Sequence, residues 1–138
     1  MTSSSAQPLE GRRILVVDDE EDVRIFLTTV LEDHGAETLE ATDGDMALEV
    51  ARREKPDLIT LDLSMPGKDG VETFHDLRKD PEVAGIPVCV VTGHPEFRKV
   101  IYERVVPPPE GFMGKPVTED QLILNVRKIL ETGRHKKT

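Results

Sequence analysis

The chain has 138 residues, and its 27 Asp and Glu residues against 18 Lys and Arg residues give a formal net charge of −9 at pH 7. This length suits one domain, and the negative charge argues against nucleic acid or an anionic membrane as the main partner, because both require a concentrated basic face. The single cysteine, Cys89, excludes an intramolecular disulfide and a cysteine-based metal cluster, and its apolar neighbours predict a buried thiol.

Five short runs rich in apolar and β-branched residues recur along the chain, separated by segments of helical period. Such runs are typical of strands that are buried on both faces of a parallel sheet. The predicted strands are Arg13–Val17, Ala36–Glu40, Leu58–Leu63, Ile86–Val91 and Gly111–Gly114.

The first three helical segments have clear apolar stripes and ends. The first ends at Gly35, a residue suited to a left-handed cap, and the second ends before Pro56. The third is expected to begin at Asp69, with Glu72 completing a capping box. The stripes consist of Val23, Leu27, Val30 and Leu31, of Met46, Ala47, Val50 and Ala51, and of Val71, Phe74 and Leu77.

The predicted fourth and fifth helices are marked by different residues at their ends. Pro95 opens a short fourth helix, and Pro107–Pro109 ends it. The three prolines predict a stiff, extended connection rather than a ligand for a proline-recognising domain. The final helix begins with a capping box of Thr118 and Gln121 and ends at Gly133.

Both ends of the chain are polar. Residues 1–10 are Ser-rich without the apolar segment of a signal peptide, so we expect a disordered N-terminal tail, and residues 134–138 form a short C-terminal tail. No run approaches the roughly 18 apolar residues of a membrane span. We therefore expect a cytoplasmic protein with one domain over residues 11–133, which leaves the output to a separate molecule.

The alternation of strands and helices predicts an α/β fold with a doubly wound, open parallel sheet. Connections between parallel strands are right-handed, and five units are too few for an eight-stranded barrel. In such sheets ligands bind at the carboxyl ends of the strands. The functional residues are therefore expected at this edge.

Acidic residues stand at the ends of two of the predicted strands. Asp18 and Asp19 follow the first strand and Asp62 stands at the end of the third, so their side chains should lie a few Å apart. Like charges about 4 Å apart repel by roughly 4 kcal/mol at an effective dielectric of 20, so the cluster needs positive charge. Lys115 supplies one positive charge, and Mg²⁺ is the cation expected to supply the rest. Taken alone, the acidic run at residues 18–21 would equally suit a first helical turn that complements the helix dipole.

A cleft with Mg²⁺, the Lys115 ammonium, the Thr92 hydroxyl and a carboxylate suits phosphoryl transfer, which depends mainly on positioning and charge neutralisation. Asp62 is the predicted nucleophile and would form an acyl phosphate. Asp19 is expected to bind the metal directly, and Asp18 directly or through water.

These residues resemble the receiver domain of response regulators in two-component signalling. The resemblance covers roughly residues 11–133 and rests on the acidic pair after the first strand, on the run Leu61–Gly70, on Thr92-Gly93 and on Lys115-Pro116. It implies the flavodoxin-like fold of these domains, a five-stranded parallel sheet in the order 2-1-3-4-5 with helices on both faces.

The resemblance also implies how the site works. Asp62 would accept a phosphoryl group from a phosphohistidine on a sensor histidine kinase or a histidine phosphotransfer protein, with Mg²⁺ required. Thr92 would hydrogen-bond the phosphoryl group, Lys115 would pair with it, and the backbone carbonyl of Ser64 would complete the metal shell. Such a protein is not an enzyme beyond its own phosphoryl transfer and slow autodephosphorylation.

Three further positions acquire a second interpretation from the resemblance. Phe112, three residues before Lys115, is either a switch aromatic that rotates on phosphorylation or a core phenylalanine. Ser64 and His94 each stand two residues after a site residue, where they would modulate the lifetime of the phosphoryl group. His94 is otherwise an exposed loop histidine.

The favoured hypothesis is a stand-alone phosphoacceptor that switches conformation and regulates a separate, unknown protein. The alternative is a binding module with the same fold that acts without phosphorylation. A flavodoxin or an aspartyl phosphatase is disfavoured, because four acids follow the first strand and Asp62-Leu63-Ser64 lacks a second aspartate.

Overall fold

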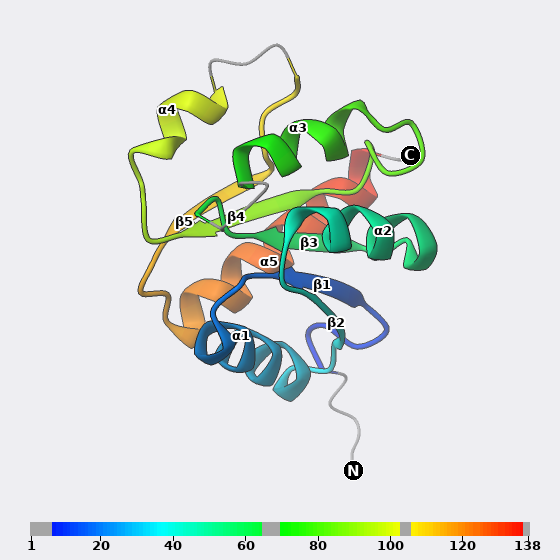
Figure 1. Ribbon diagram of the computed structural model, residues 1–138. Coiled ribbons are helices and arrows are strands. Elements are labelled where there is room, and N and C mark those ends of the chain that lie inside the picture. The colour runs from blue at the N-terminus through cyan, green and yellow to red at the C-terminus, as the bar shows by residue number, and fades with distance from the viewer. Residues whose placement is uncertain (1–6, 65–69, 103–105, 137–138) are drawn as a thin grey trace.

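The computed structural model describes residues 7–64, 70–102 and 106–136, in which five parallel strands alternate with five helices (Figure 1). The sheet order is β2-β1-β3-β4-β5, so the predicted fold class is confirmed. The strands are β1 (Arg13–Val17), β2 (Glu37–Ala41), β3 (Leu58–Leu61), β4 (Val88–Thr92) and β5 (Gly111–Gly114). The helices are α1 (Glu21–Asp33), α2 (Gly44–Glu54), α3 (Gly70–Lys79), α4 (Phe97–Tyr102) and α5 (Glu119–Lys136).

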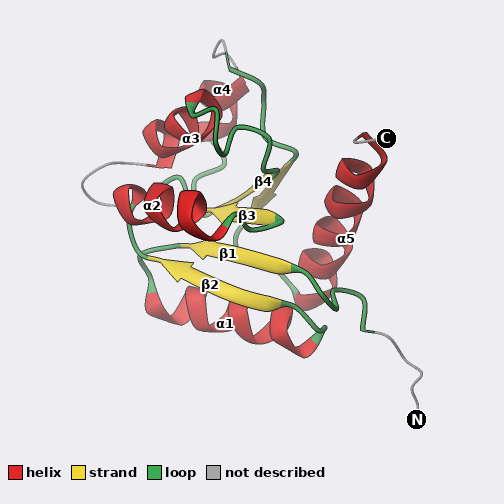
Figure 2. Cartoon of the chain, turned by 90° about the vertical axis from the view of Figure 1, so that its right-hand side faces the viewer, coloured by secondary structure: helices red, strands yellow, loops and turns green. Residues whose placement is uncertain are grey.

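Two apolar cores lie on opposite faces of the sheet. Helices α1 and α5 cover one face, and α2, α3 and α4 cover the other (Figure 2). Alternate residues of β1 enter the two cores, with Ile14 and Val16 on the α1 side and Leu15 and Val17 on the α2 side. A strand that is buried on both faces must be apolar at successive positions, which explains the continuous runs in the sequence.

Most of the predicted helix ends are found in the structure. Gly35 has a φ of 102°, a left-handed conformation that favours glycine, and it follows the end of α1. Thr118 and Gln121 form the predicted capping box, with both hydrogen bonds 3.1 Å long. The proposed cap at Asp69 lies outside the described residues.

The predicted N-terminal tail is corrected at its last residues. The Leu9 side chain has no exposed surface and belongs to the core beneath α1 and α5. The Leu9 amide donates to the carbonyl of His34 at 2.8 Å. A Cβ at Gly35 would lie 2.5 Å from the Cβ of Gln7, so glycine is needed for this close approach. The packed structure therefore begins before residue 11.

The predicted C-terminal boundary also moves. Helix α5 continues through Gly133 to Lys136 rather than ending at the glycine. Glycine inside a helix costs about 1 kcal/mol relative to alanine, which is too little to end a helix that packs against the sheet. Residues 134–136 thus belong to the helix, not to a tail.

A buried arginine holds the connection between α4 and β5. The Arg78 side chain, on α3, is only 3% exposed. Its guanidinium donates to the carbonyl oxygens of Pro107 (3.1 Å) and Pro108 (2.6 Å) and to a carboxylate oxygen of Glu110 (2.7 Å). The same Glu110 oxygen accepts the amide of Val88 at 2.8 Å. The proline-rich connection is therefore fixed to α3 and to the start of β4.

Candidate functional site

The carboxyl ends of the strands place the predicted site residues at one edge of the sheet. The parallel hydrogen-bond pattern continues just past the strands, because the Asp62 amide donates to the carbonyl of Val17 at 3.0 Å. The Lys115 amide likewise donates to the carbonyl of Thr92 at 2.8 Å. Together with the pairing of β3 and β4, these backbone bonds fix Asp62, Thr92 and Lys115 relative to one another although they are far apart in sequence.

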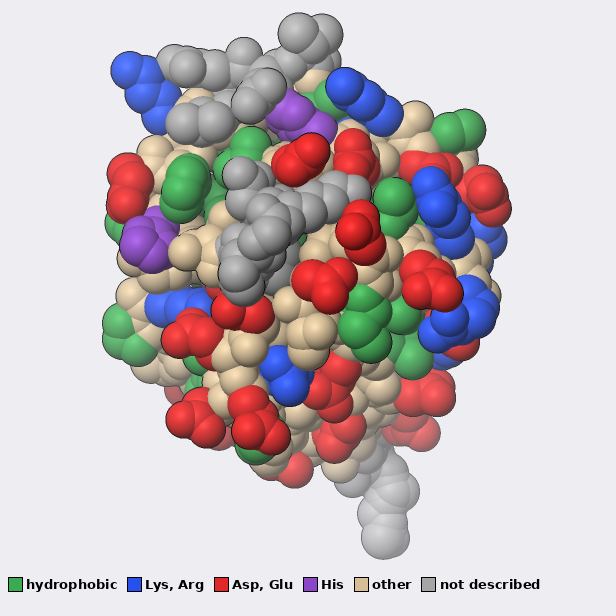
Figure 3. Space-filling view, in the orientation of Figure 1, with side chains coloured by type: hydrophobic (Ala, Val, Ile, Leu, Met, Phe, Trp, Pro, Cys, Tyr) green, Lys and Arg blue, Asp and Glu red, His purple; other side chains and the backbone are tan. Residues whose placement is uncertain are grey.

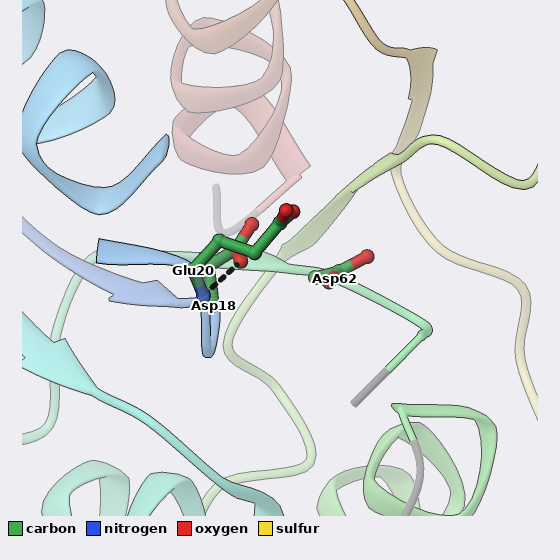
Figure 4. Close-up of side chains that lie close together, drawn as sticks. All are labelled: Asp18, Glu20 and Asp62. Atoms are coloured by element: carbon green, nitrogen blue, oxygen red, sulfur yellow. Dashed lines mark hydrogen bonds between the residues drawn. The ribbon is translucent and has the colours of Figure 1, made fainter. Parts of the chain in front are cut away.

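The Lys115 ammonium lies among three carboxylates. Its Nζ is 2.9 Å from Oδ2 of Asp18, 3.1 Å from Oε1 of Glu20 and 3.7 Å from Oδ2 of Asp62. The Asp18 and Asp62 side chains are nearly fully buried, whereas Glu20 is mostly exposed at the rim. Figure 4 shows the three carboxylates projecting from the same edge of the sheet.

Burial and charge set the ionisation of this cluster. The pKa of Asp62 is raised, first by burial and then by the negative charge of Asp18, while Lys115 opposes the rise. Burial by itself would lower the pKa of Lys115, but the hydrogen bond and charge of Asp18, with the charge of Asp62, raise it overall. The lysine therefore stays charged, and Asp62 is a carboxylate held at a cost in free energy.

The surroundings of Asp62 leave its carboxylate open to the pocket. The Ser64 amide donates to Oδ1 of Asp62 at 3.2 Å. A Cβ at Gly70 would overlap the carbonyl oxygen of Asp62, so only glycine permits α3 to begin this close to the end of β3. A pocket of about 390 Å³ opens here, lined by Asp19, Glu20, Asp62, Ser64, Gly93, His94 and Lys115.

Asp19, the predicted direct metal ligand, is not in the group of three close carboxylates. Among the described residues, Asp18, Glu20 and Asp62 each offer a carboxylate oxygen within 4.8 Å of the others. Asp19 lines the pocket, and its Oδ1 is buried without a hydrogen-bond partner. An unpartnered carboxylate oxygen beside further carboxylates fits a hard divalent cation such as Mg²⁺.

Thr92 ends β4, and His94 follows it and lines the pocket. The Thr92 side chain is fully buried, and its hydroxyl oxygen accepts the His94 amide at 3.1 Å, so its own proton is left to donate. The His94 ring is about half exposed and pairs with Glu96 at 3.1 Å. His94 is therefore a loop histidine that also lines the pocket.

Phe112 lies on β5, half-buried and close to α4. The Arg98 guanidinium lies over both its ring and that of Tyr102, with distances of 5.7 and 5.4 Å to the centroids. The two rings are 6.5 Å apart. Phe112 is thus at the edge of the core, in contact with the helix that follows Thr92 along the chain.

Glu20 is the site residue that the sequence reasoning missed. It occupies the N-cap of α1, a position that favours short polar side chains, yet its side chain makes no capping hydrogen bond. The acidic run therefore divides, because Glu21 and Asp22 form the acidic first turn of α1 while Glu20 turns to Lys115. The acidic run at residues 18–21 includes Glu20, but nothing local in the sequence separates it from Glu21.

On the face of the molecule drawn in Figure 3, Lys and Arg side chains are interspersed with Asp and Glu side chains. None of the helices in the described part of the chain could span a bilayer. Cys89 is fully buried, and burial raises the pKa of its thiol to about 12, as expected for a core residue.

Fold and site together define a doubly wound α/β protein with buried aspartates, a threonine and a lysine at the carboxyl edge of its sheet. The chain belongs to the response regulator receiver domain family, whose model matches residues 14–127. It is therefore a receiver protein of two-component signalling.

Known relatives differ in length. The chain is 35% identical over 118 residues to protein PilH of Pseudomonas aeruginosa, an alignment that covers 86% of this chain and 97% of PilH. It is 37% identical over 121 residues to the alkaline phosphatase synthesis transcriptional regulatory protein PhoP of Bacillus subtilis, covering 87% of this chain but 49% of PhoP. The chain thus spans nearly all of one relative and about half of others.

Solved structures give the same result. The chemotaxis response regulator CheY4 of Vibrio cholerae matches with a TM-score of 0.77 and 26% identity, over 86% of this chain and 98% of that chain. NtrX of Brucella abortus matches with a TM-score of 0.82 and 33% identity, over 91% of this chain and 28% of NtrX.

Proposed function

We propose that this chain is a phosphoacceptor switch in which Asp62 receives a phosphoryl group from a phosphohistidine donor. The observation that carries the proposal is the position of Asp62. Its carboxylate is 3% exposed, lines the pocket, and lies 3.7 Å from the Lys115 ammonium. Receiver-family membership makes a sensor histidine kinase or a histidine phosphotransfer protein the expected donor.

In the proposed step, a carboxylate oxygen of Asp62 attacks the phosphorus of the phosphohistidine. The new P–O bond forms as the P–N bond breaks, and the imidazole leaves with the electron pair and takes up a proton. The Ser64 amide holds one carboxylate oxygen, and Lys115 faces the other. Both contacts orient the nucleophile, and positioning accounts for much of the rate in phosphoryl transfer.

The pocket suits a resident Mg²⁺ ion. Asp19, Asp62 and the Ser64 backbone carbonyl would hold it, with Asp18 reaching it directly or through water. Asp19 supports this assignment because its buried Oδ1 lacks a hydrogen-bond partner. When bound, Mg²⁺ would offset the repulsion between these carboxylates and the phosphoryl oxygens.

Thr92, Lys115 and Phe112 would turn the modification into a change of conformation. A phosphoryl group adds charge and strong acceptors, which the Thr92 hydroxyl and the Lys115 ammonium would meet. If Thr92 turns toward the new group, the hydrogen bond from the His94 amide moves with it. This gives the pocket different contacts with two arrangements of the loop and of Phe112, as a switch requires.

The proposal extends to the remaining site residues and to the output. Ser64 and His94 line the pocket and would control access of water to the acyl phosphate, and so its lifetime. The switched state would regulate a separate protein in the cytoplasm, without nucleic acid or membrane as a partner. A single packed receiver domain is proposed from Leu9 to the end of α5.

Intact-mass measurement after incubation with acetyl phosphate and Mg²⁺ tests the proposal. We expect one phosphoryl group on the wild type, none on Asp62→Asn, and one on Asp33→Asn, which changes an exposed acid on α1. An unmodified wild type would overturn the proposal. Partner binding that is indifferent to Asp62→Asn would instead favour a binding module that acts without phosphorylation.

A further inference from the structure

Glu20 has an unusual position for an exposed glutamate. At the N-cap of α1 it could accept a backbone amide of the first turn, but it makes no such bond. Its backbone amide instead donates to Oδ1 of Asp18 at 2.9 Å, and its carboxylate accepts from Lys115 at 3.1 Å. Both contacts are with residues of the phosphoacceptor site.

Lys115 is divided unequally among its three acidic neighbours. Asp18 and Glu20 accept hydrogen bonds from Nζ, at 2.9 and 3.1 Å, whereas Asp62 lies at 3.7 Å, beyond a hydrogen bond. Asp18 is buried and fixed, so Glu20 is the neighbour that can leave. The ammonium is thus held by Asp18 and Glu20 rather than by the acceptor.

We propose that Glu20 is a positioning residue that holds Lys115 in the resting state and must release it before Lys115 can pair with a phosphoryl group on Asp62. This inference rests on the proposed phosphoacceptor function. Glu20 also places a negative charge within 4.8 Å of the Asp62 carboxylate, and this charge opposes the incoming phosphoryl group. On both grounds the glutamate slows phosphorylation.

Removal of this charge is expected to have a modest effect, because exposed ion pairs are weak and screened by salt. For Glu20→Gln we expect phosphorylation by acetyl phosphate to be about twofold to fivefold faster than in the wild type at low ionic strength. The difference should shrink in high salt. Glu21→Gln, which removes the same charge one residue further along, is the matched control and should change the rate much less.

Two measurements that do not involve phosphorylation distinguish a positioning residue from a metal ligand. Calorimetric titration with Mg²⁺ should give Glu20→Gln an affinity no lower than that of the wild type. The ¹⁵N signal of the Lys115 ammonium, assigned by its absence in Lys115→Arg, should shift in Glu20→Gln but not in Glu21→Gln. A slower rate together with weaker Mg²⁺ binding would make Glu20 a metal ligand and overturn the inference.

Other outcomes are equally decisive. Equal rates in Glu20→Gln and Glu21→Gln, with an unmoved ammonium signal, would reduce Glu20 to a general surface charge. A wild type that is phosphorylated while Glu20→Gln is no faster would refute the inference and leave the proposed function standing. A wild type that is not phosphorylated at all would overturn both.

Discussion

Asp62 should make the folded protein less stable in the absence of metal. Its carboxylate is 3% exposed, and burial is the main reason that its pKa is raised. Asp62→Asn keeps the size of the side chain and removes the charge. We therefore expect the variant to be more stable than the wild type at neutral pH in the presence of a chelator.

The magnitude follows from the distances in the site. At an effective dielectric of 20, Asp18, within 4.8 Å, repels Asp62 by roughly 3.5 kcal/mol or more, and Lys115 at 3.7 Å attracts it by roughly 4.5 kcal/mol. These two contributions nearly cancel, and the charge of Glu20 is screened by solvent at the exposed rim, so the cost of burying the charge decides the sign. We expect Asp62→Asn to raise the free energy of unfolding by about 1 to 2 kcal/mol.

The difference must also depend on pH in a defined direction. The pKa of Asp62 is raised above its ordinary value of 3.8 in the folded protein, so the folded chain binds this proton more tightly than the unfolded chain. The penalty is complete above the folded-state pKa and disappears as the pH falls below the ordinary value. The stabilisation by Asp62→Asn should therefore shrink as the solution is acidified.

Urea unfolding followed by far-UV circular dichroism measures this effect. Asp33→Asn, at an exposed position of α1, controls for the general loss of a negative charge. Millimolar Mg²⁺ should stabilise the wild type more than Asp62→Asn, because binding to the folded state alone shifts the equilibrium. A variant that is less stable than the wild type at neutral pH, or a difference that grows with acidification, would refute the reasoning.

Three further predictions concern the scaffold. Arg78→Met should lower the free energy of unfolding by about 1 to 3 kcal/mol, because it removes hydrogen bonds to the Glu110 carboxylate and to two carbonyl oxygens of the proline-rich connection. In urea unfolding, a loss no larger than that for Arg127→Met, at an exposed position of α5, would contradict this. Leu9→Ala should lower the free energy of unfolding by about 2 to 5 kcal/mol, although Leu9 lies in a segment whose sequence resembles a tail. In the same assay, Leu124→Ala, at a 59% exposed position, should lower it much less. Cys89 should not react with a thiol reagent until the protein unfolds, and labelling of the native protein would show that the site is open.

The sequence predicts the sheet and most of the site because each functional side chain stands beside the end of an apolar run. Asp62 directly follows β3, Thr92 ends β4 and Lys115 directly follows β5. In a parallel sheet these ends meet at one edge, so placing the strands also places the side chains. The predicted strand bounds can differ from the observed ones by one or two residues, as for β4, which begins at Val88 and not at Ile86. Such differences leave the side chains at the same edge of the sheet.

What the sequence could not predict depends on contacts between distant residues. Glu20 turns to Lys115, which is 95 residues away, and no local pattern distinguishes it from Glu21. Leu9 is one apolar residue in a polar segment, and its burial depends on the left-handed turn at Gly35. Arg78 looks like a surface residue near the end of α3, and only the path of the proline-rich connection buries it.

The central claim is that Asp62 itself carries the phosphoryl group. After phosphorylation with acetyl phosphate and Mg²⁺, borohydride reduces an aspartyl phosphate to homoserine, which tandem mass spectrometry of the digested protein locates. We predict homoserine at position 62 in the wild type and at no position in Asp62→Asn. Homoserine at another aspartate of the wild type, or a phosphoryl group that borohydride does not remove, would contradict the account.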